Sequence, residues 1–183
     1  MRKIITFDLD GVIFPLVQYI CARHGIDFQK VTCHNINHCS LLTREEQLTI
    51  IGEFGKRETY EHCGLSAGAE KLGTIAKLAD VYVNSWCLGE DEGIKRDILH
   101  NLAPDIPDDN MVFSTPFKKK TFVHSDYIVE DNLDNIISGL DSAEHFFLID
   151  TPYNQGELPA KTVRVKTLDE CMDLLLEKIM NNS

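Results

Sequence analysis

Two aspartates near the start of the chain, Asp8 and Asp10, have a residue type and a spacing that suit chemistry. They follow an apolar, β-forming run at residues 4–7 and precede Gly11. Side chains two residues apart on a strand point the same way, so both carboxylates should emerge together where the strand ends. Gly11 lets the backbone turn with a positive φ and keeps the pair exposed. Such a pair can hold a cation or serve as nucleophile and acid, whereas Asp-Gly alone would indicate only a polar turn.

The composition limits the classes of protein to which the chain can belong. It has 183 residues, of which 18 are basic and 29 acidic, and its net charge is −11. This length fits one domain, and the acidic surface disfavours binding to nucleic-acid polymers or anionic membranes. No apolar run approaches the ~20 residues of a membrane span, and the start lacks a signal-peptide layout. We therefore expect a cytoplasmic protein with its six cysteines as thiols, and a homodimer is possible.

Short apolar runs alternate with helical segments through most of the chain. After the run at 4–7, strands are expected at 81–83, 111–113, 127–129, 146–149 and 163–165. Helices are expected at 67–79 with Ser66 as the cap, at 90–102, at 133–140 and from 168 to 179. This alternation predicts an α/β fold, a parallel sheet with helices on both faces, which binds ligands beyond the carboxyl ends of its strands. That is where four polar residues fall: Asp8, Asp10, Ser85 and Asp131.

About fifty residues after the first strand interrupt the alternation. Residues 15–23 and 44–54 look helical. We expect residues 15–65 to form a small helical cap on a core of residues 1–14 and 66–183. A cap at this place could exclude water and select the substrate, although an extra helical pair without a gating role is the alternative.

A cluster of possible metal ligands lies within this insert, at Cys33, His34, His38 and Cys39. Zinc is one interpretation, because cysteine and histidine are its usual ligands. The ligands form two adjacent pairs, however, and adjacent side chains tend to point apart. A polar turn is therefore the favoured interpretation.

The run from Asp8 to Val12, Asp-Leu-Asp-Gly-Val, resembles the first motif of the haloacid dehalogenase (HAD) superfamily of phosphatases and phosphotransferases. The later motifs of that superfamily have counterparts in the expected order. Ser85 corresponds to the hydroxyl that binds the phosphoryl group, and a lysine within 118–120 to the one that neutralises its oxygens. Asp131, or its neighbour Glu130, corresponds to the acid that completes the cation site. The resemblance implies a HAD-like Rossmannoid fold and a hydrolase of phosphoric monoesters.

Two segments narrow the resemblance to the 5'(3')-deoxyribonucleotidases, the cytosolic type C nucleotidases. One runs from Lys120 to Asp131, and the other is the apolar strand followed by Asp-Thr-Pro-Tyr-Asn at 150–154. The register of the first implies that Lys120, and not Lys118 or Lys119, is the catalytic lysine, and that Asp131 is the metal ligand. The implied substrate is a nucleoside monophosphate, most simply a deoxyribonucleotide.

Two departures from the nucleotidase pattern concern substrate binding. The family has Thr-Ser-Pro at its second motif, where this chain has Ser85, Trp86 and Cys87. It also has an aromatic residue eight positions after the nucleophile, where this chain has Leu16. We therefore expect four residues to contact the substrate, with Trp86 able to replace the missing ring: Leu16, Ser85, Trp86 and Lys120.

The resemblance implies a two-step mechanism. Asp8 attacks phosphorus to form an aspartyl-phosphate while Asp10 protonates the leaving alcohol, and water activated by Asp10 then releases phosphate. Mg²⁺ would be bound by Asp8, Asp131 and the backbone carbonyl of Asp10. Two other interpretations stay open: a phosphatase of another small phosphorylated metabolite, and a catalytically idle metal-binding or regulatory domain.

Overall fold

The strands of the chain form one parallel sheet. In the computed structural model, which describes residues 2–88, 90–115, 120 and 123–181, the strands are β1 (Ile4–Phe7), β2 (Asp80–Trp86), β3 (Met111–Ser114), β4 (Ser125–Glu130), β5 (Ala143–Ile149) and β6 (Thr162–Val165). Their order is β3-β2-β1-β4-β5-β6, and all neighbouring pairs are parallel. The order reverses direction at β1, which is where sheets of this kind leave room for a ligand.

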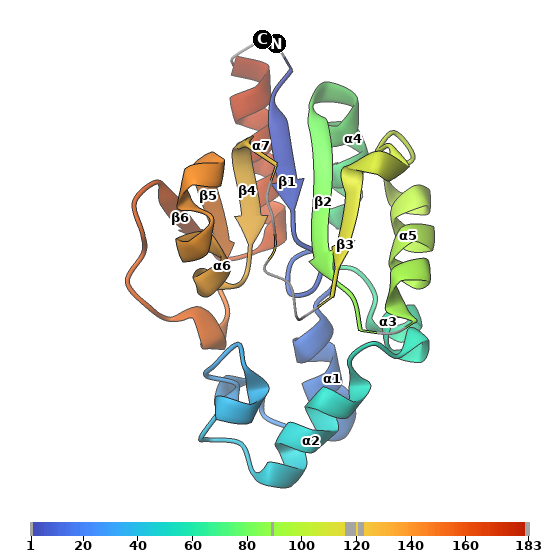
Figure 1. Cartoon of the computed structure of the whole chain (residues 1–183), viewed down its shortest axis with the longest axis vertical. Helices are drawn as coiled ribbons and strands as arrows, with labels where there is room; N and C mark the ends of the chain where they lie inside the picture. The colour runs from blue at the N-terminus through green and yellow to red at the C-terminus, as the bar shows by residue number, and fades with distance from the viewer. Residues whose placement is uncertain (1, 89, 116–119, 121–122, 182–183) are drawn as a thin grey trace.

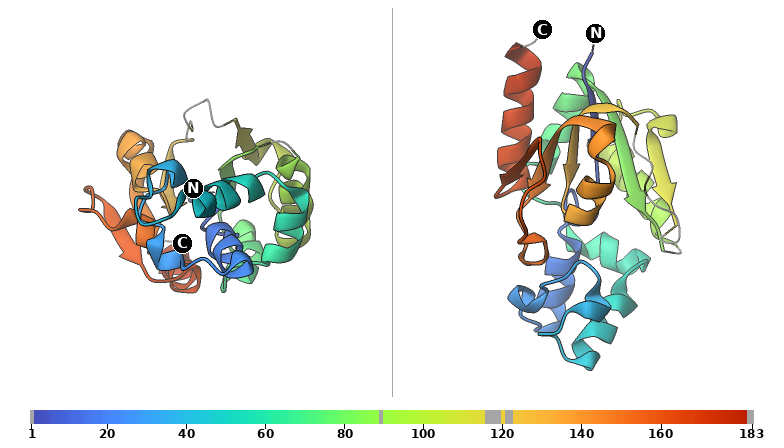
Figure 2. Two further views of the ribbon diagram at one scale, coloured as in Figure 1. Left: turned by 90° about the horizontal axis from the view of Figure 1, so that it is seen from below. Right: turned by 60° about the vertical axis from the view of Figure 1, so that its left-hand side comes forward.

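Seven α-helices are described: α1 (Leu16–His24), α2 (Arg44–Glu53), α3 (Arg57–Cys63), α4 (Leu72–Leu78), α5 (Asp91–Leu102), α6 (Leu133–Ser138) and α7 (Leu168–Asn181). Short 3₁₀ helices lie at Phe28–Lys30, Ile36–His38, Ala69–Lys71, Asp108–Asn110, Leu140–Ser142 and Pro152–Asn154. α4 and α7 cover one face of the sheet and α6 packs on the other (Figures 1 and 2). The predicted α/β architecture, with helices on both faces, is confirmed.

The core explains why the strands read as short, continuous apolar runs. Ile5 and Phe7 of β1 are fully buried because β1 lies between β2 and β4 and is covered on both faces. A smaller apolar cluster beneath α6 includes Ile128 and Phe146 on the other face of the sheet. Side chains buried on both faces do not alternate with polar ones, as is typical of parallel sheets.

The chain turns sharply after β1. The backbone N–H of Asp8 still donates to the Val129 carbonyl at 2.9 Å, so Asp8 continues the ladder to β4. Gly11 then adopts a φ of +86°, and its N–H donates to the Phe14 carbonyl at 2.7 Å. Asp8 therefore lies at the strand end and Asp10 in a tight turn, instead of both lying on one extended strand.

The segment between β1 and α4 lies beyond the carboxyl ends of the strands, at the bottom of Figure 1, and Figure 2 shows it below the sheet in a second view. α2 begins with a reciprocal cap, in which Glu46 N–H donates to Thr43 Oγ1 at 3.2 Å and Thr43 N–H to Glu46 Oε2 at 2.6 Å. The third α-helix of this inserted segment, α3, was not expected from the sequence. That the segment acts as a cap stays a prediction.

Two boundaries differ from those expected. Ser66 does not cap a helix, because the chain first forms the 3₁₀ turn Ala69–Lys71 before α4 begins. β2 is longer than its apolar run, so Ser85 lies inside the strand and not just past it.

Among the described helices, none is long and apolar enough to cross a membrane. The cytoplasmic location and the possible homodimer stay predictions.

Gly55 brings the inserted segment close to the core. It has a φ of +76°, and a Cβ there would collide with the backbone carbonyl of Leu88. Gly25 has a similar φ of +67°, but a Cβ there would meet no described atom within 4 Å.

Gly25→Ala should thus carry only the backbone strain, about 1–2 kcal/mol. Gly55→Ala should add the cost of moving the segment, about 1–3 kcal/mol more. Urea unfolding of both variants measures the difference, and equal losses would show that Gly55 does not set this contact.

Candidate active site

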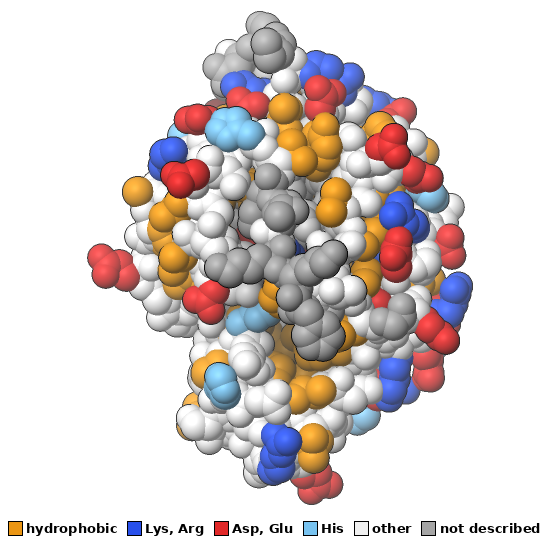
Figure 3. Space-filling model, in the orientation of Figure 1, with side chains coloured by type: hydrophobic (Ala, Val, Ile, Leu, Met, Phe, Trp, Pro, Cys, Tyr) orange, Lys and Arg blue, Asp and Glu red, His pale blue; other side chains and the backbone are white. Residues whose placement is uncertain are grey.

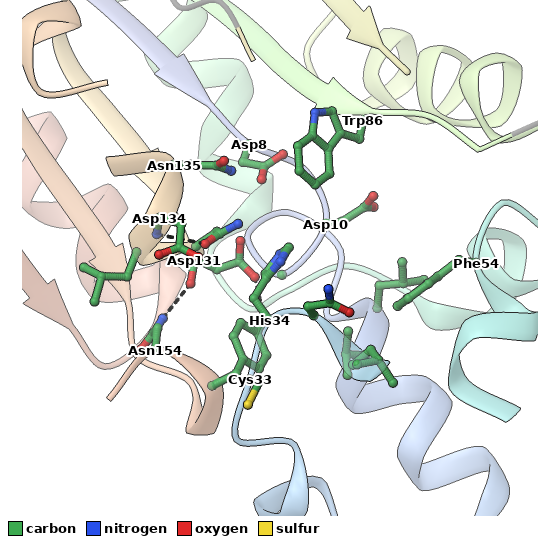
Figure 4. Close-up of a pocket in the computed structure, with 18 of the residues that line it drawn as sticks. Asp8, Asp10, Cys33, His34, Phe54, Trp86, Asp131, Asp134, Asn135 and Asn154 are labelled. Carbon is green, nitrogen blue, oxygen red and sulfur yellow. Dashed lines mark hydrogen bonds between the residues drawn. The ribbon is translucent and has the colours of Figure 1, made fainter. Parts of the chain in front are cut away.

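The carboxyl ends of β1, β2 and β4 meet at one edge of the sheet. A cavity of about 1120 Å³ opens there toward the inserted segment, and hydrophobic side chains gather in the hollow (Figure 3). The described residues that line it include Asp8, Asp10, Leu16, Ser85, Trp86, Lys120 and Asp131. Every predicted site residue thus faces one space (Figure 4 draws several of them). Lys118 and Lys119, the alternatives to Lys120, lie outside the described residues.

Lys120 joins two carboxylates at the centre of the site. Its Nζ lies 2.5 Å from Asp8 Oδ2 and 2.8 Å from Glu130 Oε1, and its side chain is almost fully buried. Burial lowers the pKa of Lys120, but the two carboxylates outweigh it and raise the pKa above its usual value. Lys120 therefore stays an ammonium, able to neutralise anionic oxygens beside Asp8.

Three carboxylates at this centre have the chemistry of a cation site. One oxygen each of Asp8, Glu130 and Asp131 lies within 4.8 Å of the others. Both oxygens of Glu130 have donors, because Oε1 accepts from Lys120 and Asn135 and Oε2 from the Asn132 N–H at 3.2 Å. Glu130 was the alternative to Asp131 as a metal ligand, and its saturated oxygens make it the poorer candidate.

Asp131 has an oxygen to offer. Its Oδ2 accepts from the Tyr153 hydroxyl at 2.5 Å, whereas its Oδ1 is buried without a partner among the described residues. An unpaired buried carboxylate oxygen is costly, and a hard cation such as Mg²⁺ prefers oxygen ligands. Burial, and then the charges of Asp8 and Glu130, raise the pKa of Asp131, which a bound cation would reverse. These residues fit a magnesium ion.

Gly11 leaves the space that Asp131 occupies. A Cβ at Gly11 would collide with the Asp131 carboxylate and come within 2.9 Å of the Tyr153 hydroxyl. The first motif thus needs glycine for two reasons, the positive φ and this close approach. The carboxylate of Asp131 can lie against the turn only because position 11 has no side chain.

The loop after β5 fixes the backbone of Asp131 by a hydrogen bond. Asn154 Nδ2 donates to the backbone carbonyls of Asp131 and Ile149, both at 2.7 Å. Arg164 on β6 donates in turn to Asn154 Oδ1 at 2.5 Å. The sequence singled out Tyr153 and Asn154 only as a family likeness, and Arg164 was missed. Their role here is to fix the orientation of Asp131.

Asp10 is held by a second buried lysine that the sequence reading missed. Lys95 Nζ donates to Asp10 Oδ2 and to the Trp86 carbonyl, both at 2.7 Å, and lies 3.2 Å from Asp91 Oδ2. Desolvation raises the pKa of Asp10 although Lys95 opposes the shift, and the charges of Asp8 and Asp91 raise it further. A carboxyl group with a raised pKa beside a nucleophilic carboxylate is suited to act as a general acid.

Lys95 was missed because its spacing is that of a surface ion pair. Asp91 and Lys95 are four residues apart on α5, which usually indicates a solvated helix face. The expected apolar face was Ile94, Ile98 and Leu102, but the fully buried residues include Lys95 and Leu99. The usable signal was that Lys95 precedes Leu99 by one helical turn, on the same face.

The predicted substrate contacts lie in the cavity wall. Ser85 is fully buried, accepts from Lys95 Nζ at 3.3 Å and donates to the Trp86 carbonyl at 3.3 Å. The ring of Trp86 lies with its centroid 5.9 Å from Lys120 Nζ. Leu16 is 2% exposed, so it belongs to the core as much as to the cavity. Phe14, two residues before Leu16, packs on Tyr60 with 5.6 Å between the ring centroids.

His34 projects from the inserted segment into the cavity. Its ring centroid lies 5.9 Å from that of Tyr153 and 6.3 Å from that of Trp86, and Figure 4 shows it facing the acidic residues. Cys33 and Cys39 instead bond to backbone carbonyls of their own loop. In the described part of the chain, Asp8, Glu130 and Asp131 form the cluster of side chains that could together bind a metal ion. The polar-turn interpretation of residues 33–39 stays a prediction.

Neither a protein-family model nor a curated protein sequence matches the chain. Solved structures do. A candidate β-phosphoglucomutase from Thermotoga maritima gives a TM-score of 0.59 at 16% identity, over 96% of this chain and 99% of that one. D,D-heptose 1,7-bisphosphate phosphatase from B. bronchiseptica, complexed with magnesium and phosphate, gives 0.58 at 12% identity, over 96% and 99%. A HAD-superfamily hydrolase from Ehrlichia chaffeensis gives 0.57 at 15% identity, over 98% and 99%.

At these identities the likeness concerns the fold. The chain has the fold of HAD hydrolases, as the first motif implied. The narrower nucleotidase resemblance continues to rest on the sequence segments alone.

Lys95→Met should destabilise the protein strongly. It removes the ammonium group between Asp10 and Asp91 and leaves two carboxyl groups without their cation, which costs about 3–5 kcal/mol for a buried pair. Lys77→Met, at an exposed position on α4, should change the free energy of unfolding by less than about 0.5 kcal/mol. Urea denaturation monitored by circular dichroism compares the two. A loss below about 1 kcal/mol for Lys95→Met would mean that Lys95 does not balance this charge.

Proposed function

We propose that this chain is a Mg²⁺-dependent phosphomonoesterase that forms an aspartyl-phosphate on Asp8. One observation carries the proposal: the Asp8 carboxylate lies at the carboxyl edge of the sheet in contact with buried Lys120, with Asp131 on one side and Asp10 in the same cavity. A nucleophile, a cation site, an anion-neutralising lysine and an acid are the parts that phosphoryl transfer through an enzyme carboxylate requires. The magnesium and phosphate in the heptose bisphosphate phosphatase of the same fold add support.

In the first step an Asp8 oxygen attacks the phosphorus atom, and the bond from phosphorus to the ester oxygen breaks. Asp10 gives its proton to that leaving oxygen. Lys95 holds Oδ2 of Asp10, whereas the buried Oδ1 has no partner among the described residues. Lys120 Nζ and the Ser85 hydroxyl stabilise the charge on the transferring phosphoryl oxygens.

In the second step a water molecule attacks the phosphorus of the aspartyl-phosphate, and Asp10 accepts a proton from that water. The bond between phosphorus and Asp8 breaks, which releases phosphate and restores the carboxylate. Asp8, Asp131 and the Asp10 backbone carbonyl would hold Mg²⁺, which supplies positive charge against the repulsion between anionic nucleophile and anionic phosphate.

Within this class we favour a nucleoside monophosphate, with a deoxyribonucleotide the first choice. The cavity of about 1120 Å³ is large enough, and its wall carries the rings of His34, Phe54, Trp86 and Tyr153. Stacking of a base on an aromatic face contributes about 1–3 kcal/mol. Trp86 could supply this contact from the core in place of a ring at Leu16.

A sugar phosphate or another small phosphorylated metabolite is the second candidate. The cavity is also lined by amide side chains, among them Asn35, Asn135 and Gln155, which suit hydroxyl groups. The heptose bisphosphate phosphatase of the same fold also has a sugar phosphate in its name.

A panel of phosphate esters tests the proposal. The purified chain should release phosphate from at least one class among nucleoside monophosphates, sugar phosphates and p-nitrophenyl phosphate when Mg²⁺ is present, and excess EDTA should abolish the release. Asp8→Asn should lower kcat by about 10³-fold or more, because the amide cannot act as nucleophile. Asp141→Asn, at an exposed acid on the short helix before β5, should leave kcat unchanged.

The rates of phosphate release from nucleoside monophosphates and from sugar phosphates, compared within the panel, decide between the two substrate classes. Full turnover in the chelator, or in Asp8→Asn, would contradict the mechanism. Absence of phosphate release from every ester would favour the idle binding domain.

A further inference from the structure

Tyr60 belongs to the inserted segment, yet its hydroxyl reaches an acid of the core. It lies on α3, and its hydroxyl donates to Asp10 Oδ2 at 3.2 Å, with Asp91 Oδ2 as a second acceptor at 3.4 Å. Only 2% of Tyr60 is exposed. A buried hydroxyl on an inserted segment is thus in direct contact with the proposed acid.

The ring of Tyr60 is fixed by its neighbours. It forms a T-shaped pair with the ring of Phe14, with 5.6 Å between the centroids and 85° between the ring planes, and Lys95 Nζ lies 4.9 Å from the Tyr60 centroid. An ammonium near an aromatic ring and an edge-to-face ring pair are both attractive. The hydroxyl is therefore held in place before any substrate binds.

Tyr60 and Lys95 approach the same oxygen of Asp10. Lys95 contributes its bond from the core and Tyr60 from the inserted segment, both to Oδ2. Two donors on one carboxyl oxygen limit rotation of the group, so that the carboxyl group of Asp10 keeps a constant orientation beside the cavity that Asp10 lines. Proton transfer depends steeply on such placement.

We infer that Tyr60 is a positioning residue for Asp10, so that the inserted segment takes part in the acid–base step in addition to covering the cavity. This inference rests on the proposed phosphomonoesterase function. Because the hydroxyl comes from α3, Asp10 is held by both donors only while α3 is seated on the core. The core alone, with Lys95 as its one donor to Asp10 among the described contacts, would hold the acid less firmly.

Tyr60→Phe tests the inference, because it removes the hydroxyl and keeps the ring that packs on Phe14. The readout is kcat/KM for phenyl phosphate and for p-nitrophenyl phosphate, two esters of similar shape. Phenolate is the poorer leaving group and depends more on the acid. kcat/KM reports the step that forms the aspartyl-phosphate, in which Asp10 donates its proton. We expect a loss of about tenfold for phenyl phosphate and a loss of less than about threefold for p-nitrophenyl phosphate.

Retained turnover of p-nitrophenyl phosphate shows that the variant site is intact. Tyr19→Phe, which removes a hydroxyl from α1 of the same segment, is the matched control and should change neither value. Equal losses for both esters would assign Tyr60 a merely structural role, and no loss for either would show that its hydroxyl is idle. Both outcomes overturn the inference while the proposed function stands. Wild-type protein that hydrolyses no ester would remove the proposed function and this inference together.

Discussion

The site depends on the balance of charge at the carboxyl edge of the sheet. Five carboxyl groups gather there: those of Asp8, Asp91, Glu130 and Asp131 are buried, and that of Asp10 is 29% exposed. The ammonium groups of Lys95 and Lys120 can balance two of them. Unbalanced buried charge is costly, so the remaining three need compensation. A divalent cation and one proton would supply it, and these are what the proposed phosphatase requires: Mg²⁺ beside Asp8 and a protonated Asp10.

The fold provides this concentration of charge by its topology. β1 lies between β2 and β4, so the ends of three strands bring Asp8, Ser85 and Asp131 together. Each lysine then links two parts of the structure. Lys120 ties the end of β1 to the end of β4, and Lys95 ties α5 to the turn after β1. Stability and the proposed chemistry therefore rest on the same contacts.

Local patterns in the sequence predicted the sheet, and the residues that they singled out line one cavity, although the roles of these residues stay predictions. These patterns involve residues that are neighbours along the chain. They are the apolar run before Asp8, the alternation of strands and helices, and the spacing that distinguishes Lys120 from Lys118 and Lys119. The spacing of Lys95 and Leu99 indicates only that Lys95 is buried. The contacts of Lys95, Asp91 and Tyr60 around Asp10 could not be predicted in this way, because each residue looks like an ordinary surface or core residue of its own helix. Only the tertiary structure brings α3 and α5 to Asp10. The placement of Arg164 behind Asn154 was equally beyond reach, since the two residues meet across a loop.

The central claim is that phosphate is transferred to Asp8. Its most direct test is to quench the enzyme in acid during turnover of a ³²P-labelled ester, reduce the acyl phosphate with borohydride, and map the modified peptide by mass spectrometry. The account predicts a label that appears within the first turnover and a reduced side chain at Asp8, both absent from Asp8→Asn. Turnover without a labelled protein, or a modification at Asp10 or Asp131 in place of Asp8, would contradict it.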